Sequence, residues 1–239
     1  MAKFNSEWIV QPHGMLEPVA EGLWTVAGSI VMPLGRFPRR MTVIALAAGG
    51  IAVWSPIALD EAQMARIDAL GPVRALIVPN QGHRLDIRPW KARYPQARVI
   101  APPSAREGVA EAVPVDATGD VLHDPAIAFA LVAGTRADEF ALTVTRAEGT
   151  TLILNDILSN VRHPQGLGAH IMARLLGFGV KRPRTSRPVR RMFVADPAAV
   201  AAQFRDWADR PDLRRIIVSH GDVIGDGAAA ALRRAAADF

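Results

Sequence analysis

Three apolar runs, each ending abruptly in polar residues, place the strongest constraint on how this chain can fold. They are residues 75–78, 151–154 and 216–218, and the polar residues that follow them include His83, Asp156 and His220. Short apolar runs of this kind are typical of buried strands. Because ligands of open α/β sheets sit at the carboxyl ends of strands, the function depends on whether these three strand ends meet in space.

The composition is that of an ordinary globular protein with a sizeable core. Of the 239 residues, 50% are hydrophobic and 21% are charged, and there is no cysteine. Disulfides and thiolate ligands are therefore excluded, and any metal must be held by histidine and carboxylate. The lack of cysteine fits a reducing compartment, so we expect a cytoplasmic protein. No apolar run approaches the ~18 residues of a membrane span and residues 1–12 do not resemble a signal peptide, so we expect no membrane partner.

The positive charge is concentrated in one basic segment, residues 181–191, within a chain of net charge +5. Aromatic residues are scattered along the chain and are not interleaved with the basic ones, which argues against a nucleic-acid-binding surface. We expect the segment to be a solvated loop. Its Arg187 and Arg190 are candidates for holding an anionic substrate or partner.

Hydrophobic periodicity predicts strands and hairpins followed by β/α units, in an order that occurs twice. We expect a loop or hairpin over residues 29–40, a hairpin turn at Gly49 and Gly50, and a short strand at residues 113–115. The expected helices cover residues 60–70, 87–94, 104–112, 166–177, 196–208 and 228–237. No linker divides the chain, so we predict a single domain over residues 1–239 with its core at about 22–227. The predicted fold class is α/β, a four-layer αββα sandwich of two sheets with helices outside.

With these elements in this order, the chain resembles the metallo-β-lactamase superfamily, and within it a divergent group of metallo-β-lactamase-like proteins. The resemblance covers about residues 22–227 and includes the hairpin at Gly49 and the three strand ends. Asp156 stands where the family's Gly-Asp segment has an aspartate that can bridge two metals. His220 stands at the histidine of the family's closing His-Gly pair. The resemblance thus implies the fold, a metal centre and hydrolytic activity.

Several positions that hold metal ligands in the family are occupied here by residues that are not ligands of the family. The H-x-H-x-D-H motif that follows the first strand end falls on Asn80, Gly82, Arg84 and Leu85. His83 lies one residue out of register with that motif. The family's middle histidine is replaced by Thr135, and an earlier strand-end aspartate is replaced by Ser55. The resemblance therefore implies a degenerate metal site.

The residues that remain suggest one metal rather than two. His83, Asp156 and His220 form a two-histidine, one-carboxylate set suited to a single divalent ion such as zinc, iron or manganese. Asp86 or Asp222 is expected to be a fourth ligand or the general base. Asn80, Glu139 and Asn155 are further candidates for binding, together with the two arginines of the basic segment.

Three functions stay open from the sequence. The first is a mononuclear metal-dependent hydrolase acting on an ester, a lactone or a phosphoester. The second is a non-catalytic protein that keeps the fold, has lost the metal and has no cofactor, and binds a small molecule or a protein. The third, which ranks last, is an anionic-surface or nucleic-acid binder that uses residues 181–191. The expected partner is a small molecule, anionic if the two arginines contact it.

Overall fold

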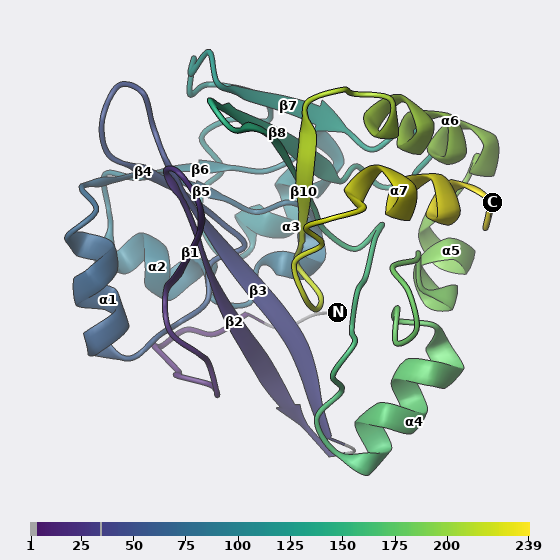
Figure 1. Cartoon of the computed structure of the whole chain (residues 1–239). Coiled ribbons are helices and arrows are strands. Elements are labelled where there is room, and N and C mark those ends of the chain that lie inside the picture. Colours follow the sequence, from purple (N-terminus) through teal and green to yellow (C-terminus); the bar gives the residue numbers. More distant parts are fainter. Residues whose placement is uncertain (1–3, 34) are drawn as a thin grey trace. The chain divides into compact units, whose positions relative to one another are not determined.

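Two β-sheets organise the computed structural model, which describes residues 4–33 and 35–239 (Figure 1). The chain divides into two compact units, each built around one of these sheets. The first unit comprises residues up to 29 and 40–125, and the second comprises residues 30–39 and 126–239. The expected loop or hairpin at residues 29–40 includes position 34, which lies outside the described residues. The single-domain prediction stays a prediction.

The first unit contains a sheet with the strand order β1-β2-β3-β4-β5-β6 in the described residues. Its strands are β1 (Glu17–Ala20), β2 (Leu23–Met32), β3 (Gly35–Ala45), β4 (Ile51–Trp54), β5 (Val73–Ile77) and β6 (Arg98–Ile100). The expected hairpin turn at Gly49 and Gly50 joins the antiparallel strands β3 and β4, and both glycines have φ of +84°. From β4 onward the pairing is parallel, so the carboxyl ends of β4, β5 and β6 lie at one edge.

Helices of the first unit cover this sheet with apolar side chains. They are α1 (Glu61–Asp68), α2 (Ile87–Arg93) and α3 (Arg106–Ala110), with the short 3₁₀ helices η1 (Gln81–His83) and η2 (Pro103–Ala105). The Asp60 carboxylate accepts a hydrogen bond from the Gln63 backbone at 2.9 Å and so begins α1. Met64 of α1 and Trp90 of α2 are fully buried in one cluster with Leu76 of β5.

The second unit contains a sheet with the strand order β10-β9-β8-β7 in the described residues. Its strands are β7 (Ile127–Leu131), β8 (Phe140–Arg146), β9 (Gly149–Leu154) and β10 (Leu213–Val218). The expected hairpin of β8 and β9 is present, and β9 runs parallel to β10 with Leu154 opposite Val218. This register brings the carboxyl ends of β9 and β10 to the same edge.

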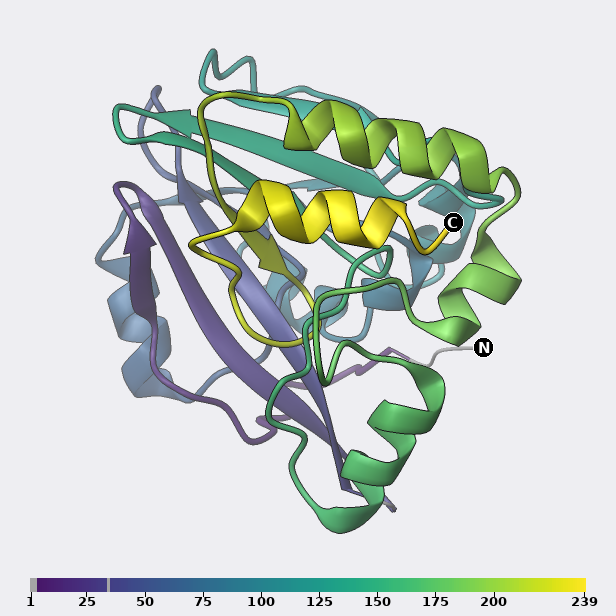
Figure 2. The same ribbon diagram turned by 45° about the vertical axis from the view of Figure 1, so that its right-hand side comes forward.

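Helices of the second unit are α4 (Leu167–Leu176), α5 (Arg187–Phe193), α6 (Pro197–Ala208) and α7 (Ala228–Ala236). Asp196 caps α6 by accepting from the Ala199 backbone, and Pro197 occupies its first turn. In both views α6 and α7 run side by side (Figure 2). Phe204 and Leu232 from these helices are fully buried in one cluster with Leu154 of β9.

Two predictions about local structure were wrong. No strand forms at residues 113–115, although Val113 and Val115 are buried. The basic segment is not a loop throughout, because α5 begins within it. Ser186 accepts from the Val189 backbone at 3.4 Å and caps this helix, so the arginines of its first turns are helical. Among the described residues, no helix is long and apolar enough to cross a membrane.

Candidate metal centre

Two strand ends of the second unit lie side by side and carry the predicted ligands Asp156 and His220. The pairing of β9 with β10 continues past the strands, because the Ser219 backbone N–H donates to the Leu154 carbonyl at 3.0 Å. Nε2 of His220 lies 2.8 Å from Oδ1 of Asp156. The imidazole is buried and the carboxylate is half-buried. The structure thus brings these two predicted ligands together.

The backbone fixes the other side of the His220 ring. Nδ1 of His220 lies 2.8 Å from the carbonyl oxygen of Pro38, which belongs to the same unit. Because a carbonyl can only accept, Nδ1 carries a proton and donates it. Histidines that bind metals in proteins commonly hold their second ring nitrogen in this way, which sets both the tautomer and the ring orientation. The ring of Phe37 packs against the imidazole with their centroids 4.8 Å apart.

The pKa of His220 is raised above its ordinary value. Burial alone would lower this pKa, because it disfavours the charged imidazolium, but the hydrogen bond and charge of Asp156 and the Pro38 carbonyl outweigh that effect. The nearby Asp156 carboxylate therefore favours the form of the ring that carries a proton on Nε2. A divalent cation could replace that proton, because metal binding requires a deprotonated ring nitrogen.

Gly221 lets the backbone turn directly after His220. Its φ is +112°, and a Cβ placed there would lie 2.1 Å from the carbonyl oxygen of Asn160. At this close approach the Asn160 N–H donates to the His220 carbonyl at 3.0 Å, and the Asp222 N–H donates to the Asn160 carbonyl at 2.9 Å. A side chain at this position would force the two segments apart, so glycine is needed to hold His220 where it is.

In the first unit, the ends of β4 and β5 bring Ser55 and His83 together. The Ser55 hydroxyl oxygen lies 2.7 Å from Nδ1 of His83, and the Ser55 backbone N–H donates to the Ile77 carbonyl at 2.9 Å. Ser55 has φ of +52°, a conformation that side-chain-bearing residues rarely adopt. Strain of this kind is concentrated at functional sites. The first unit therefore presents an oriented imidazole at the carboxyl edge of its parallel strands.

The other candidates of the first unit, Asn80 and Asp86, have contacts that shape the backbone around His83. The Asn80 side chain accepts from the Gly82 N–H at 2.8 Å and begins η1, the short helix that carries His83. Asp86 is fully buried, and its carboxylate accepts from the Asn5 side chain at 2.7 Å and from the Ala58 N–H at 3.2 Å. Their roles in binding and catalysis stay predictions.

Three candidates of the second unit lie in or near the loops that carry the Asp156–His220 pair. The buried Glu139 accepts from the Ile157 N–H at 3.0 Å and so holds the loop that follows Asp156. The Asp222 carboxylate lies 3.1 Å from Nδ1 of His163. The Asn155 side chain is buried, and its amide makes no hydrogen bond with any residue that the structure describes. Their predicted roles in binding and catalysis stay predictions.

The arginines Arg187 and Arg190 lie on α5, where each has an intramolecular contact. Arg187 donates to the Leu175 carbonyl at 2.9 Å, at the end of α4, and so helps to terminate that helix. The Arg190 guanidinium lies over the ring of Phe239, 5.5 Å from its centroid. Both side chains are also exposed, and their predicted role toward an anion stays a prediction.

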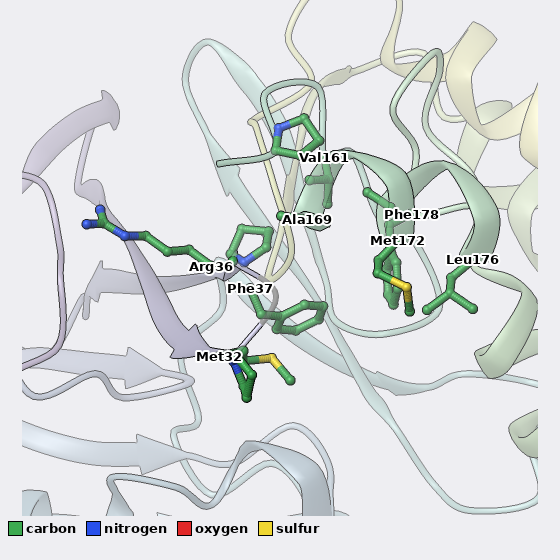
Figure 3. A pocket seen from close by; sticks show the side chains of 13 residues that line it. Met32, Arg36, Phe37, Val161, Ala169, Met172, Leu176 and Phe178 are labelled. Carbon is green, nitrogen blue, oxygen red and sulfur yellow. The ribbon is translucent and has the colours of Figure 1, made fainter. Parts of the chain in front are cut away.

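An apolar cavity of about 400 Å³ lies within the second unit, between α4 and a segment that we call the hairpin tip, residues 30–33 and 35–39 (Figure 3). Phe37 and Phe178 meet edge to face in its wall, with centroids 5.4 Å apart. The guanidinium of Arg36 points away from the apolar side chains. Phe37 and Pro38 line the cavity and also contact His220, so the cavity adjoins the Asp156–His220 pair.

The hairpin tip was missed as part of a site from the sequence. Pro38 acts through its backbone carbonyl, which no residue pattern reveals. Phe37 and Met172 line the cavity from segments more than a hundred residues apart. Single apolar residues in a Gly- and Pro-rich stretch carry no signal of such a pairing. For Ser55, the sequence offered one indication of a role in the site, which is that it occupies the position of the family's strand-end aspartate.

Solved structures match this chain over nearly its whole length, whereas no protein family model and no curated protein sequence matches it. The metallo-β-lactamase FIM-1 from Pseudomonas aeruginosa, in a mono-zinc form, matches with a TM-score of 0.64 and 13% identity, covering 96% of each chain. The chain has the metallo-β-lactamase fold. A metallo-β-lactamase from Erythrobacter litoralis matches with a TM-score of 0.60 and 18% identity over 94% of this chain and 92% of that one. A metallo-β-lactamase from Hirschia baltica matches with a TM-score of 0.62 and 14% identity, covering 95% of this chain and 98% of that one.

These matches confirm the predicted fold class, a mixed α/β fold with two sheets and helices. At such low sequence identity they establish the fold and not the activity. The donors of the second unit fit a metal ion on chemical grounds. A carboxylate oxygen and an imidazole nitrogen suit zinc, iron or manganese, and the Nδ1 contact with Pro38 directs Nε2 toward the carboxylate.

Proposed function

We propose that this protein is a hydrolase that uses one divalent metal ion held by His83, Asp156 and His220. The observation that carries the proposal is that both ring nitrogens of His220 have a partner. The Pro38 carbonyl lies at Nδ1 and the Asp156 carboxylate at Nε2. Ordinary salt bridges do not require a backbone carbonyl behind the imidazole, whereas metal ligands commonly have one. The mono-zinc form of the FIM-1 neighbour is in keeping with a single ion on this fold.

His83 is proposed as the third ligand because it shares the features of the other two. It follows a parallel strand of the same fold, and a hydroxyl at Nδ1 orients its ring. With Nδ1 engaged by Ser55, the ring would offer Nε2 to the metal. A catalytic metal in proteins typically has three protein ligands and one position left for water.

A second metal ion is not part of this proposal, because Arg84 stands where the family motif has its aspartate. The Arg84 side chain is 2% exposed and pairs with Glu111 at 2.8 Å. It also lies over the ring of Phe4, 5.7 Å from the centroid. A buried cation fixed by these contacts cannot act as a metal ligand, since a guanidinium has no acceptor.

In the proposed reaction the residues of this chain bind and orient, and one of them takes a proton. A divalent metal, when bound, lowers the pKa of a coordinated water to about 7 and polarises the bond to be cleaved. Asp222 is our proposed general base, because its half-buried carboxylate follows His220 by two residues. Asp86 is assigned to holding the N-terminal segment through Asn5.

The apolar cavity beside His220 supports a substrate with an apolar portion next to its ester, lactone or phosphoester group. A cavity of about 400 Å³ is within the range of small-molecule sites, and such sites are mostly apolar with a few polar groups that fix orientation. An apolar group held against Phe37 would lie beside the imidazole that Phe37 contacts. Binding energy from that group would then position the bond to be cleaved.

The experiment is a hydrolysis screen of esters, lactones and phosphodiesters with zinc-, iron- and manganese-loaded protein. We expect metal-dependent turnover that His220→Ala abolishes, while the control His170→Ala on α4 keeps it. As a readout besides activity, zinc should raise the Tm of the wild type and of the control but not that of His220→Ala.

The alternative is a binding protein that keeps the fold without catalysis, and the contacts of Arg84 are the observation that favours it. Under this alternative, neither zinc, iron nor manganese changes the Tm and no substrate turns over. Metal binding without turnover would point to a metal-dependent binding protein instead.

A further inference from the structure

Helix α4 is apolar on the side that faces the cavity and also on the side that faces solvent. Ala169, Ala173 and Leu176 line the cavity. Leu167, Ile171 and Leu175, at spacings of four, are 89%, 59% and 58% exposed. The solvent-facing side of a surface helix is normally polar, so exposed apolar side chains at this spacing are unusual. An exposed apolar patch of this kind indicates an interaction surface.

Other elements of the same unit also carry exposed apolar side chains. In the hairpin tip, Val31 and Met32 are 59% and 52% exposed, and on α5, Met192 and Phe193 are 57% and 42% exposed. Figure 2 shows α4 beside the end of the β2–β3 ribbon. We call these exposed side chains of α4, α5 and the hairpin tip the apolar surface.

The chain segment that carries α4 and α5 has formal charges of one sign. Residues 157–195 include seven arginines and one lysine and no aspartate or glutamate. The net charge of the whole chain is +5, so the rest of the chain is net negative and the positive charge is segregated here. Six of these basic side chains are exposed, and they are Arg162, Arg174, Lys181, Arg187, Arg190 and Arg191.

We propose that the apolar surface docks onto an anionic lipid membrane, with α4 lying in the interface and not crossing it. Exposed leucine and isoleucine beside arginine and lysine are the composition of interfacial helices, whose apolar side chains enter the acyl boundary while the basic ones meet anionic headgroups. This proposal departs from the expectation of no membrane partner, which was based on spanning segments and signal peptides and did not consider interfacial helices. It does not depend on the proposed hydrolase.

A second copy of the chain is the less favourable occupant on grounds of charge. In a symmetric dimer the apolar surface of one copy would meet that of the other, so the exposed arginines and lysine of the two copies would repel each other. An anionic membrane instead complements both the apolar surface and these basic side chains. Met32 of the apolar surface also lines the cavity, and so does the 38% exposed Met172 of α4. An acyl chain could therefore pass from the apolar surface into the cavity.

The test is vesicle co-sedimentation of the full chain with phosphatidylcholine alone and with phosphatidylcholine containing phosphatidylglycerol. We expect binding to the anionic vesicles only, weakened by salt. Ile171→Glu with Leu175→Glu should reduce the partition coefficient at least about tenfold, because a buried Leu or Ile side chain contributes roughly that factor. Arg174→Gln with Arg191→Gln should reduce it about 25-fold, at roughly fivefold per charge.

Matched controls lie in the first unit. Met15 is 60% exposed and Arg106 is exposed on α3, so Met15→Glu and Arg106→Gln make similar changes away from the apolar surface and should keep binding. Circular dichroism checks that each variant is folded.

The proposal is overturned if wild type does not bind anionic vesicles, or if the controls lose binding as strongly as the α4 variants. It is also overturned if Ile171→Glu instead dissociates a dimer, or if duplex DNA binds where vesicles do not.

Discussion

Replacing Gly221 by alanine tests the backbone geometry behind the Asp156–His220 pair. The new Cβ would lie 2.1 Å from the Asn160 carbonyl oxygen and 2.7 Å from the Val161 nitrogen. Both neighbours are backbone atoms, so no side chain can swing aside to relieve the contact. The segments on either side of Gly221 must separate, and His220 moves with them.

The cost follows from two contributions. Holding an alanine at φ of +112° costs about 1–3 kcal/mol. Separating the segments weakens two backbone hydrogen bonds, from Asn160 to His220 and from Asp222 to Asn160, at about 1 kcal/mol each. The variant should therefore lose about 3–5 kcal/mol of unfolding free energy, or roughly 6–20 °C in Tm for a chain of this size.

Urea unfolding followed by tryptophan fluorescence measures this loss, and Gly225→Ala is the matched control. Gly225 lies in the same loop, and a Cβ there meets nothing within 4 Å, so its change should stay within about 0.5 kcal/mol. Zinc binding should weaken in Gly221→Ala and not in Gly225→Ala. If the two variants unfold within about 1 kcal/mol of each other, the described approach of Gly221 to Asn160 is wrong.

Other predictions concern the two units separately. Phe204→Ala removes a fully buried ring from the second unit and should cost about 3–5 kcal/mol in urea unfolding. Asp196→Ala removes the cap of α6 and should cost about 1 kcal/mol. In the first unit, the hydrogen bond from Arg93 lowers the pKa of Glu61. Its stabilisation is present above the unfolded pKa of about 4.3 and is lost as pH falls through the folded pKa. The difference in urea midpoint between wild type and Arg93→Leu should therefore narrow as pH falls below about 4.3, and a constant difference would contradict this.

The strand ends could be predicted from the sequence because each joins an apolar run to polar residues. Leu154 and Val218 are buried and paired, so the residues after them must emerge at one edge. The periodicity does not say which strands are neighbours. The expectation that Asp156 and His220 belong to one site therefore came from the resemblance and not from the pattern.

The rest of the site could not be predicted because it depends on backbone atoms and distant segments. The Pro38 carbonyl and the cavity behind Phe37 join residues 30–39 to elements beyond residue 160, and no local pattern encodes that contact. The density of charge in the basic segment also led to a wrong prediction of its secondary structure. The arginines of the basic segment suggested a solvated loop, whereas the cap at Ser186 makes part of it helical.

Zinc titration of metal-free protein tests the central claim most directly, because it asks whether His83 shares an ion with Asp156 and His220. Calorimetry of wild type should show one zinc per chain, and X-ray absorption of the complex should show two imidazole ligands. His83→Ala should weaken binding by more than about 100-fold, since even indirect partners of a metal site contribute 10–100-fold, while His170→Ala should not. Unchanged zinc affinity in His83→Ala, or a single imidazole in the wild-type complex, would contradict the account.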